Sequence, residues 1–345
     1  MGRLASQEGM TQRKVPKMPS IALMTVHARY PWLRQMPGED LLPEGWHVTL
    51  NTVAEDCALV VVYDDPGKPF RTGVPKERRI VILSEPPGIT TYRKGFLDQF
   101  GVVYGPIRPE GHSGRWIATQ PALPWFFGVG FGKDGLITNL DADAIAALPP
   151  PPKARALSVV ISGKTQLPKH RARLALVEAL KARLGDRLHV FGRGFQDIDD
   201  KADAILPYAY HLVLENNDIP HFWTEKTADA YLGWAYPIFS GCANLSQYMP
   251  EDSFTPIDIE QPEEAIATIL QVLDTDPWEQ RLPEIAEARR RILFEHNVFA
   301  VLGKLAGEFG SVVPAGGVPK TVYGQRDLTF KARARALLQR VLGSG

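Results

Sequence analysis

Cysteine is scarce in this chain, and its scarcity excludes two classes of protein. Only Cys57 and Cys242 occur among the 345 residues, and they lie far apart in the sequence. Such a pair matches neither the ligand spacing of a zinc site nor the cysteine pattern of a disulfide-rich secreted domain. The sequence therefore predicts two reduced thiols in a cytoplasmic protein.

Net charge and long apolar runs are also lacking. Lys and Arg together number 39, as do Asp and Glu, so no bulk electrostatic attraction to nucleic acid is expected. No apolar run reaches the roughly 18 residues that a membrane span requires. The first residues carry Arg3, Lys14 and Lys17 without an apolar block, which does not fit a secretory signal. We expect a flexible leader over residues 1–17.

The chain does contain enough apolar sequence for two globular domains. Hydrophobic residues make up 44% of it and charged residues 23%, which is typical of a globular protein. A length of 345 residues exceeds one ordinary core. The prolines at 149–152, followed by Lys153, form a stiff extended spacer. We predict a first domain over 18–150 and a second over 151–310, whose last helices cross back to the first.

A tail over residues 311–345 follows the second domain. It contains a basic stretch, Lys331–Leu342, with Arg333, Arg335 and Arg340, in a pattern typical of a helix. Two interpretations stay open: a solvated helix that packs on the body of the protein, or a helix that makes a weak contact with a membrane surface.

Short apolar runs alternate with helical stretches on both sides of the spacer. Such runs predict parallel strands buried on both faces of a sheet. They are Ile21–Val26, Ala58–Tyr63 and Arg79–Leu83 before the spacer, and Leu157–Ser162, Leu188–Phe191, Tyr210–Leu214 and Tyr236–Ser240 after it. Helices are expected over 170–184 and 224–233. The alternation predicts an α/β fold with two doubly wound, Rossmann-like domains facing one another.

The segment 208–241 carries the most informative pattern. A strand runs into the polar cluster that begins with Glu215 and Asn216, a helix opens with Thr224, Glu225 and Lys226, and a second strand follows. Ligands of such a unit bind at the carboxyl ends of the strands and the helix N-terminus. A lysine in the first turn opposes the helix dipole unless an anion lies nearby. The segment therefore predicts a site for a ribose and phosphate groups.

This segment resembles the sugar-donor signature of the α-1,3/1,4-fucosyltransferase family, glycosyltransferase family 10, in its bacterial form. The matching positions are Tyr208, Tyr210, Leu212, Glu215, Asn216, Thr224, Glu225, Lys226, Pro237 and Gly241. Phe222 stands where the family has a tyrosine, and we expect it to form a wall of the donor site. The resemblance implies two domains of the GT-B type that face each other across a cleft.

The same resemblance implies a function. We expect an inverting glycosyltransferase that takes fucose from GDP-fucose and transfers it to a glycan hydroxyl. It also implies that Glu225 contacts the ribose of the sugar donor, that Lys226 contacts its phosphates, and that Glu215 and Asn216 lie at the same rim. Two alternatives stay open: a transferase for another GDP-sugar, and a non-catalytic homologue that binds a sugar or a nucleotide.

The loop at residues 162–165, Ser-Gly-Lys-Thr, mimics the end of a phosphate-binding P-loop. The full P-loop pattern requires a glycine five residues before the Gly-Lys pair, and that position is Ser158, which excludes an ATPase or GTPase. The stretch instead resembles the family's strand, loop and helix, in which Lys164 lies in the loop and an arginine of the helix binds phosphate. That arginine corresponds to Arg173, with Arg171 as the alternative register.

A catalytic carboxylate is expected in the first domain. Glu85 follows the buried run Arg79–Leu83 and precedes two prolines, which places it at the carboxyl end of a strand, where ligand-facing residues sit. The resemblance implies that Glu85 is the catalytic base. Alternatively, Glu85 has a structural role and caps the next helix. Asp64 and Asp65 are the other candidates for the catalytic base.

No metal or other cofactor is expected to be required. Asp-x-Asp triplets, the metal signature of other glycosyltransferases, occur at 141–143, 197–199 and 274–276, but they read as loop or helix-start carboxylates. The histidines show no ligand spacing. Because acceptor loops vary freely on a fixed scaffold, the sequence leaves the acceptor open.

Overall fold

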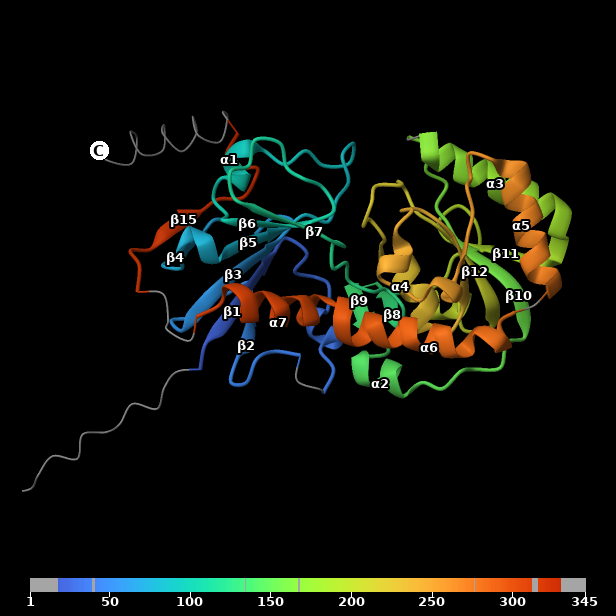
Figure 1. Ribbon diagram of the computed structural model, residues 1–345, viewed down its shortest axis with the longest axis horizontal. Helices are drawn as coiled ribbons and strands as arrows, with labels where there is room; N and C mark the ends of the chain where they lie inside the picture. Colours follow the sequence, from blue (N-terminus) through green and yellow to red (C-terminus); the bar gives the residue numbers. More distant parts are fainter. Residues whose placement is uncertain are drawn as a thin grey trace, which may run out of the picture.

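The computed structural model describes residues 18–38, 41–133, 135–166, 168–275, 277–311 and 316–329. It consists of two lobes side by side, each built around one parallel sheet (Figure 1). The leader predicted over 1–17 and the basic helix predicted over Lys331–Leu342 lie outside the described residues. Among the residues that are described, no helix is both long and apolar enough to cross a bilayer.

The first sheet has the strand order β2-β1-β3-β5-β6-β7, with every neighbouring pair parallel. Its strands are β1 Ser20–Thr25, β2 His47–Leu50, β3 Cys57–Tyr63, β5 Arg79–Ile82, β6 Val102–Gly105 and β7 Arg115–Ala118. Strands β1, β3 and β5 confirm the three predicted runs, and each is buried throughout. The edge strands β2 and β7 are only partly buried, so they lack the continuous apolar pattern that predicts a central strand.

Helices and loops cover both faces of the first sheet. One face packs against α7 Val298–Phe309, and the other against α1 Lys94–Leu97 and its neighbours. A small antiparallel pair, β4 Phe70–Thr72 with β15 Lys320–Val322, lies at the rim.

Helix α7 brings the chain back to the first lobe (Figure 1). Phe299 and Leu302 are fully buried in the first-domain core. A β-carbon on Gly303 would lie 1.9 Å from the carbonyl oxygen of Leu41, so only glycine allows this helix to approach so closely. The return of a late helix to the first domain is the arrangement that the sequence led us to expect.

The second sheet has the order β11-β10-β12-β13-β14 and is also fully parallel. Its strands are β10 Arg155–Val160, β11 Leu188–Phe191, β12 Tyr208–Leu214, β13 Tyr236–Ser240 and β14 Thr255–Pro256. Its helices are α3 Pro168–Leu184, α4 Glu225–Leu232, α5 Pro262–Thr275 and α6 Leu282–Arg291. The four predicted strands and both predicted helices are confirmed, and Figure 1 shows α3 and α5 together on the outer side of this lobe.

Both sheets share one topological feature that fixes where a ligand can bind. The first strand of each sheet lies between the second and the third, so the strand order reverses between β1 and β3 and again between β10 and β12. Ligands of doubly wound sheets bind in the crevice outside the carboxyl ends of the strands at this reversal. Residues that follow the strands of both sheets line one pocket between the lobes, which confirms two Rossmann-like domains facing across a cleft.

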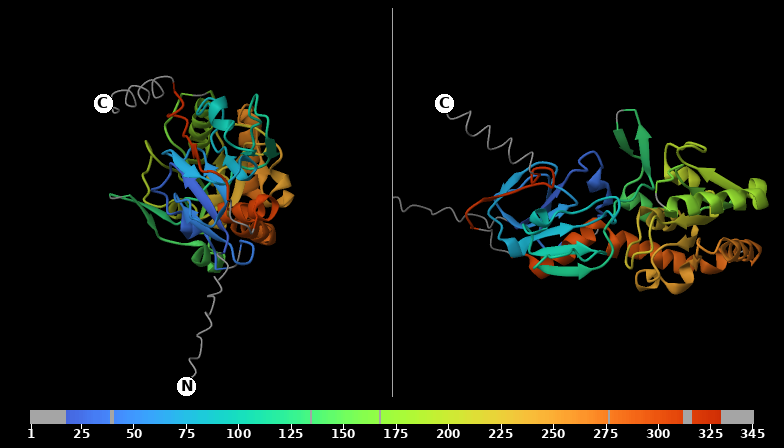
Figure 2. Two further views of the ribbon diagram at one scale, coloured as in Figure 1. Left: turned by 90° about the vertical axis from the view of Figure 1, so that its left-hand side faces the viewer. Right: turned by 90° about the horizontal axis from the view of Figure 1, so that it is seen from above.

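The chain crosses between the lobes earlier than the proline spacer. Trp125 and Phe127 already belong to the second-domain core, together with Ile145 of α2 Ala142–Ala147. Between them, β8 Val129–Gly132 and β9 Gly135–Thr138 form a hairpin that projects between the lobes (Figure 2). The spacer at 149–153 therefore leads into β10 from a segment that already packs on the second domain.

Arg34 holds this crossover from the first-domain side. Its guanidinium is buried and donates hydrogen bonds to the carbonyl oxygens of Trp125 (3.1 Å), Phe127 (2.6 Å) and Leu140 (2.7 Å). From the other side, the Asp229 carboxylate of α4 accepts the backbone N–H groups of Phe126 and Phe127, both at 2.9 Å. The crossover is thus fixed to both domains through its own backbone.

Replacing Arg34 by methionine should destabilise the protein by about 2–4 kcal/mol. The buried carbonyl group of Phe127 and the partly buried one of Leu140 lose their donor. The carbonyl group of Trp125 keeps only the Tyr30 hydroxyl. Urea denaturation of the two proteins measures this difference. Arg29→Met is the matched control, since Arg29 is exposed and its loss should change the free energy of unfolding by less than about 0.5 kcal/mol. Equal stability of the two variants would contradict this account of the crossover.

Candidate active site

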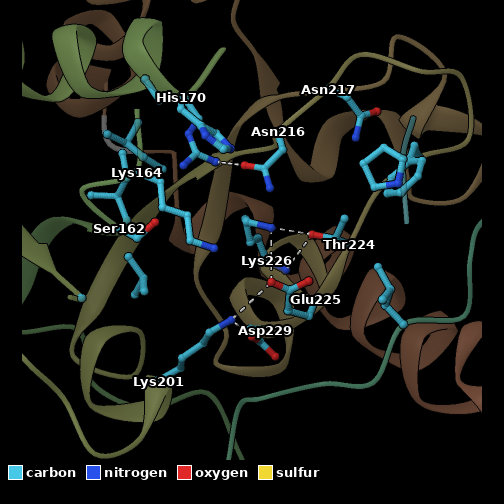
Figure 3. A pocket seen from close by; sticks show the side chains of 18 of the residues that line it. Ser162, Lys164, His170, Lys201, Asn216, Asn217, Thr224, Glu225, Lys226 and Asp229 are labelled. Atoms are coloured by element: carbon cyan, nitrogen blue, oxygen red, sulfur yellow. Dashed lines mark hydrogen bonds and ion pairs between the residues drawn. The ribbon is translucent and has the colours of Figure 1, made fainter. Parts of the chain in front are cut away.

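A cavity of about 480 Å³ lies between the two domains, lined by residues of both. Its volume suits a ligand of small-molecule size. The first domain contributes Ser84, Glu85, Pro86, Ile89 and Leu123. The second domain contributes the loops that follow β10, β11 and β12 and the first turns of α3 and α4 (Figure 3).

Cations dominate the wall formed by the second domain. Lys164, Arg173, Arg193, Lys201 and Lys226 all line it, against the carboxylates of Glu225 and Asp229. The N-terminal ends of α3 and α4 lie at the same wall. Cationic side chains beside helix N-termini form an anion site, so this wall can bind a diphosphate.

Arg173, and not Arg171, reaches the pocket. Its buried guanidinium donates to the carbonyl oxygen of Leu214 at 3.1 Å and makes a close hydrogen bond to the side-chain oxygen of Asn216. Its Nε is buried and finds no partner among the described residues. Burial lowers the pKa of Arg173, although the carboxylates of Glu215 and Glu225 oppose the shift. Arg171 is exposed and donates to the carbonyl oxygen of Thr165.

Glu215 lies beneath the pocket and supports it from below. It is fully buried, and its carboxylate accepts the backbone N–H of Thr224 at 2.8 Å and the hydroxyl groups of Thr224 and Thr227 at 2.7 and 3.0 Å. A β-carbon on Gly241 would lie 2.9 Å from this side chain, which explains a glycine there. Glu215 does not line the cavity, whereas Asn216, the next residue, does.

Lys226 and Glu225 form a charged pair in the first turn of α4 (Figure 3). The Lys226 ammonium lies 3.2 Å from the Glu225 carboxylate, 3.0 Å from the Thr224 hydroxyl and 3.4 Å from the Glu215 carboxylate. Burial alone would lower the pKa of Lys226, but Glu225 and Glu215 outweigh it and raise the pKa. Burial likewise favours neutral Glu225, but Lys226 and Lys201 outweigh it and lower the pKa of Glu225 to about 2. Both groups are charged at neutral pH.

Two further predicted residues line the cavity. Phe222 is buried and presents an apolar ring to the wall, and Lys164 extends from the exposed loop after β10. Two residues that were not predicted from the sequence, Lys201 and Asp229, form an ion pair of 2.7 Å at the same wall. Asp229 could have been found, because it lies four residues after Glu225 and so on the same helix face. Lys201 comes from another segment and carries no such pattern.

Glu85 faces the cationic wall from the first domain. It is half-buried, and burial is the main cause of its raised pKa, followed by the charges of Asp64 and Glu225. The charges of His27 and Lys226 act in the opposite direction. Helix α1 begins at Lys94, so Glu85 does not cap it.

The other candidate carboxylates do not reach the cavity. Asp64 is buried behind Ser84, and Asp65 accepts the backbone N–H groups of Gly67 and Gln325. Asp197 and Asp199 line a separate hollow beside β11. Within the described ranges, no three His, Cys, Asp or Glu side chains are grouped so as to hold a metal ion.

Residues 151–281 match the family model described as glycosyltransferase family 10 (fucosyltransferase), C-terminal. This part of the chain is therefore similar to the C-terminal region of glycosyltransferase family 10. The matched region contains the cationic wall and excludes Glu85, so the similarity rests on the second domain. The match agrees with the family that the sequence resembles.

Curated relatives also match only part of the chain. The human 4-galactosyl-N-acetylglucosaminide 3-alpha-L-fucosyltransferase FUT6 is 30% identical over 110 residues, which cover 30% of this chain and 30% of that protein. Human 3-galactosyl-N-acetylglucosaminide 4-alpha-L-fucosyltransferase FUT3 gives the same identity over the same length. The match thus spans less than a third of the relatives' length.

Solved structures resemble most of the chain at low identity. A crystal structure of an alpha1,3-fucosyltransferase with GDP-fucose is 16% identical, with a TM-score of 0.46 over 86% of this chain and 96% of that one. An Escherichia coli structure described as trehalose-6-phosphate bound with UDP-2-fluoro glucose is 12% identical, with a TM-score of 0.46 over 78% and 75% of the chains.

Proposed function

We propose that this protein is an inverting transferase that moves fucose from GDP-fucose to a hydroxyl group of a glycan. One observation carries the proposal: the cavity sets the cationic wall of the second domain opposite the Glu85 carboxylate of the first. A leaving diphosphate needs the cations, and an attacking hydroxyl needs a base. The family description and the names of the curated relatives favour fucose as the sugar.

The diphosphate would bind at Arg173 and Lys226, with Lys164 closing from the loop after β10. The guanidinium fork suits phosphate oxygens, and the Lys226 ammonium at the start of α4 is held by carboxylates on its other side. Glu225 would accept hydrogen bonds from the ribose, and Phe222 would form an apolar wall. In this arrangement the cations stabilise the growing charge of the leaving group, so we propose that no metal is required.

Transfer would proceed in one displacement. The acceptor oxygen forms a bond to the anomeric carbon from the face opposite to GDP, while the bond from that carbon to the phosphate oxygen breaks. GDP leaves with the electron pair, and Glu85 takes the proton of the acceptor hydroxyl. A raised pKa makes the ionised Glu85 a stronger base than an ordinary glutamate. The product would carry the inverted anomeric configuration.

GDP should stabilise the protein in a thermal-shift screen, whereas UDP, CMP and NAD should not. At a hundredfold excess over its dissociation constant, a ligand adds about 2.7 kcal/mol of stability, which corresponds to roughly 4 °C in a chain of this size. Stabilisation by UDP alone would contradict the proposed donor.

The two arginines of α3 supply a matched pair of variants for the same screen. Arg173→Ala should weaken GDP binding by about 10- to 100-fold, because charge-assisted hydrogen bonds to phosphate are lost. Arg171→Ala removes the same charge two residues earlier, from an exposed position, and should bind GDP like the parent protein. Equal losses in both variants would place the phosphate site elsewhere.

Glu85→Gln should slow transfer by about 10²- to 10⁴-fold and leave GDP binding nearly intact, because the amide keeps the shape of the side chain but cannot take a proton. The reaction is followed in buffer that contains EDTA, as fucose transfer to a glycan panel and as GDP release to water. NMR of the product gives its anomeric configuration.

Each outcome of that assay identifies a different error. Near-normal transfer by Glu85→Gln would mean that the base lies elsewhere. A loss of GDP binding would assign Glu85 to the donor site. Retained configuration would contradict the single displacement, and a parent protein that binds GDP but turns over no donor, with or without a glycan, would be a non-catalytic homologue.

A further inference from the structure

We propose that Asp64 and His27 are positioning residues for Glu85: the Asp64 carboxylate holds the peptide that carries Glu85, and His27 contacts that carboxylate. This inference rests on the proposed role of Glu85 as the base. Neither residue lines the cavity, so both act through Glu85 and not on the substrate.

The pair occupies the point of the first sheet where a doubly wound fold places its functional groups. His27 follows β1 and Asp64 follows β3, the two strands between which the strand order reverses. Asp64 adopts a φ of 59°, in the left-handed region that non-glycine residues occupy at a cost. The surrounding contacts must therefore fix this conformation.

Those contacts saturate the Asp64 carboxylate. It accepts the backbone N–H of Ser84 at 2.8 Å, the hydroxyl of Tyr92 at 2.6 Å and a close hydrogen bond from the Ser84 hydroxyl. The Nε2 atom of His27 lies 3.2 Å away. A carboxylate offers about four lone-pair sites, so none remains for a substrate. Asp64 is thus excluded as an alternative base, and its contacts point towards Glu85 instead.

Most of these contacts converge on the peptide of Glu85. Ser84, which bonds Asp64 through both its backbone and its side chain, immediately precedes Glu85. The Tyr92 hydroxyl, which donates to Asp64, also accepts the backbone N–H of Glu85 at 3.3 Å. The buried Asp64 carboxylate therefore fixes Ser84 directly, and it fixes the backbone N–H of Glu85 through the Tyr92 hydroxyl. Such fixed orientation is what a general base needs for efficient proton transfer.

Asp64 and His27 shift the pKa of Glu85 in opposite directions. Burial is the main cause of the raised pKa of Glu85, and the negative charges of Asp64 and Glu225 raise it further. His27 lowers that pKa, as Lys226 does from the second domain. The hydrogen bond to Asp64 is the main cause of the raised pKa of His27, helped by the charges of Glu85 and Asp65 and opposed by burial. The pair thus combines a cation with an anion beside the base.

Because the two effects on the pKa of Glu85 are opposite, each variant should shift the pH profile in a different direction. Removing the Asp64 charge lowers the pKa of Glu85, so Glu85 stays ionised to lower pH. Removing the His27 cation raises the pKa of Glu85, so activity begins to fall at higher pH. If the pair had a purely structural role, the two variants would not shift the acid limb of the pH profile in opposite directions.

The experiment compares Asp64→Asn with His27→Gln in the full chain, measuring GDP release from GDP-fucose against pH. The acid limb of kcat/KM should move to lower pH in Asp64→Asn and to higher pH in His27→Gln, each by about half to one pH unit. Asp64→Asn should also lower kcat by about tenfold, because Glu85 is less firmly held, while GDP binding stays within about twofold of the parent protein.

Asp65→Asn is the matched control, since it removes the same charge from the adjacent residue, whose carboxylate bonds Gly67 and Gln325. It should leave the acid limb unmoved. If Asp64→Asn does not fold, Tyr92→Phe replaces it: kcat should fall by a few-fold with an unmoved acid limb, because no charge changes. His27 has a half-exposed side chain, so His27→Gln tests the pair in either case.

Acid limbs of His27→Gln and Asp64→Asn that coincide with the parent profile would overturn the proposal, as would a parental kcat in Tyr92→Phe. Failure of the base assignment itself has a different signature. If Glu85→Gln retains the acid limb and the rate of the parent protein, the base lies elsewhere, and the pair cannot act through it.

Discussion

Both walls of the active site depend on the contacts of one side chain, the Asp229 carboxylate. It is buried one turn after Glu225 in α4, pairs with Lys201 at 2.7 Å and accepts two backbone N–H groups of the crossover between the domains. Removing one partner of a buried ion pair leaves an uncompensated charge that costs several kcal/mol. The helix that presents Lys226 to the cavity is therefore also the helix that holds the crossover between the domains.

Parallel sheets explain why so many charges gather in a chain without net charge. The carboxyl ends of all strands in a parallel sheet lie at one edge, and both sheets turn that edge towards the cleft. The central strands are mostly apolar and buried, so most of the charged residues near this edge lie in the loops that follow them. The second domain concentrates cations at this edge and the first presents Glu85, a division that favours a leaving phosphate on one side and a base on the other.

The central strands and much of the cationic wall could be predicted from the sequence, because both depend on local patterns. Helical geometry then decides between Arg171 and Arg173, since two residues differ by about 200° around a helix, and only Arg173 faces inward. Neighbouring residues after a strand point to opposite sides, which sends Glu215 beneath the wall and Asn216 into the cavity. The contact of His27 with Asp64 joins residues 37 apart, and Lys201 lies 28 residues from Asp229. Such pairs depend on strand order, which no local pattern specifies.

Hydrogen–deuterium exchange with and without GDP tests the division of labour between the domains most directly. We expect slower exchange of backbone amides over residues 161–173 and 216–229, which contain most of the cationic wall. Little change is expected over 84–89, because GDP lacks the sugar that would reach Glu85. Protection confined to the first domain, with none over 216–229, would contradict the central claim that the second domain holds the sugar donor.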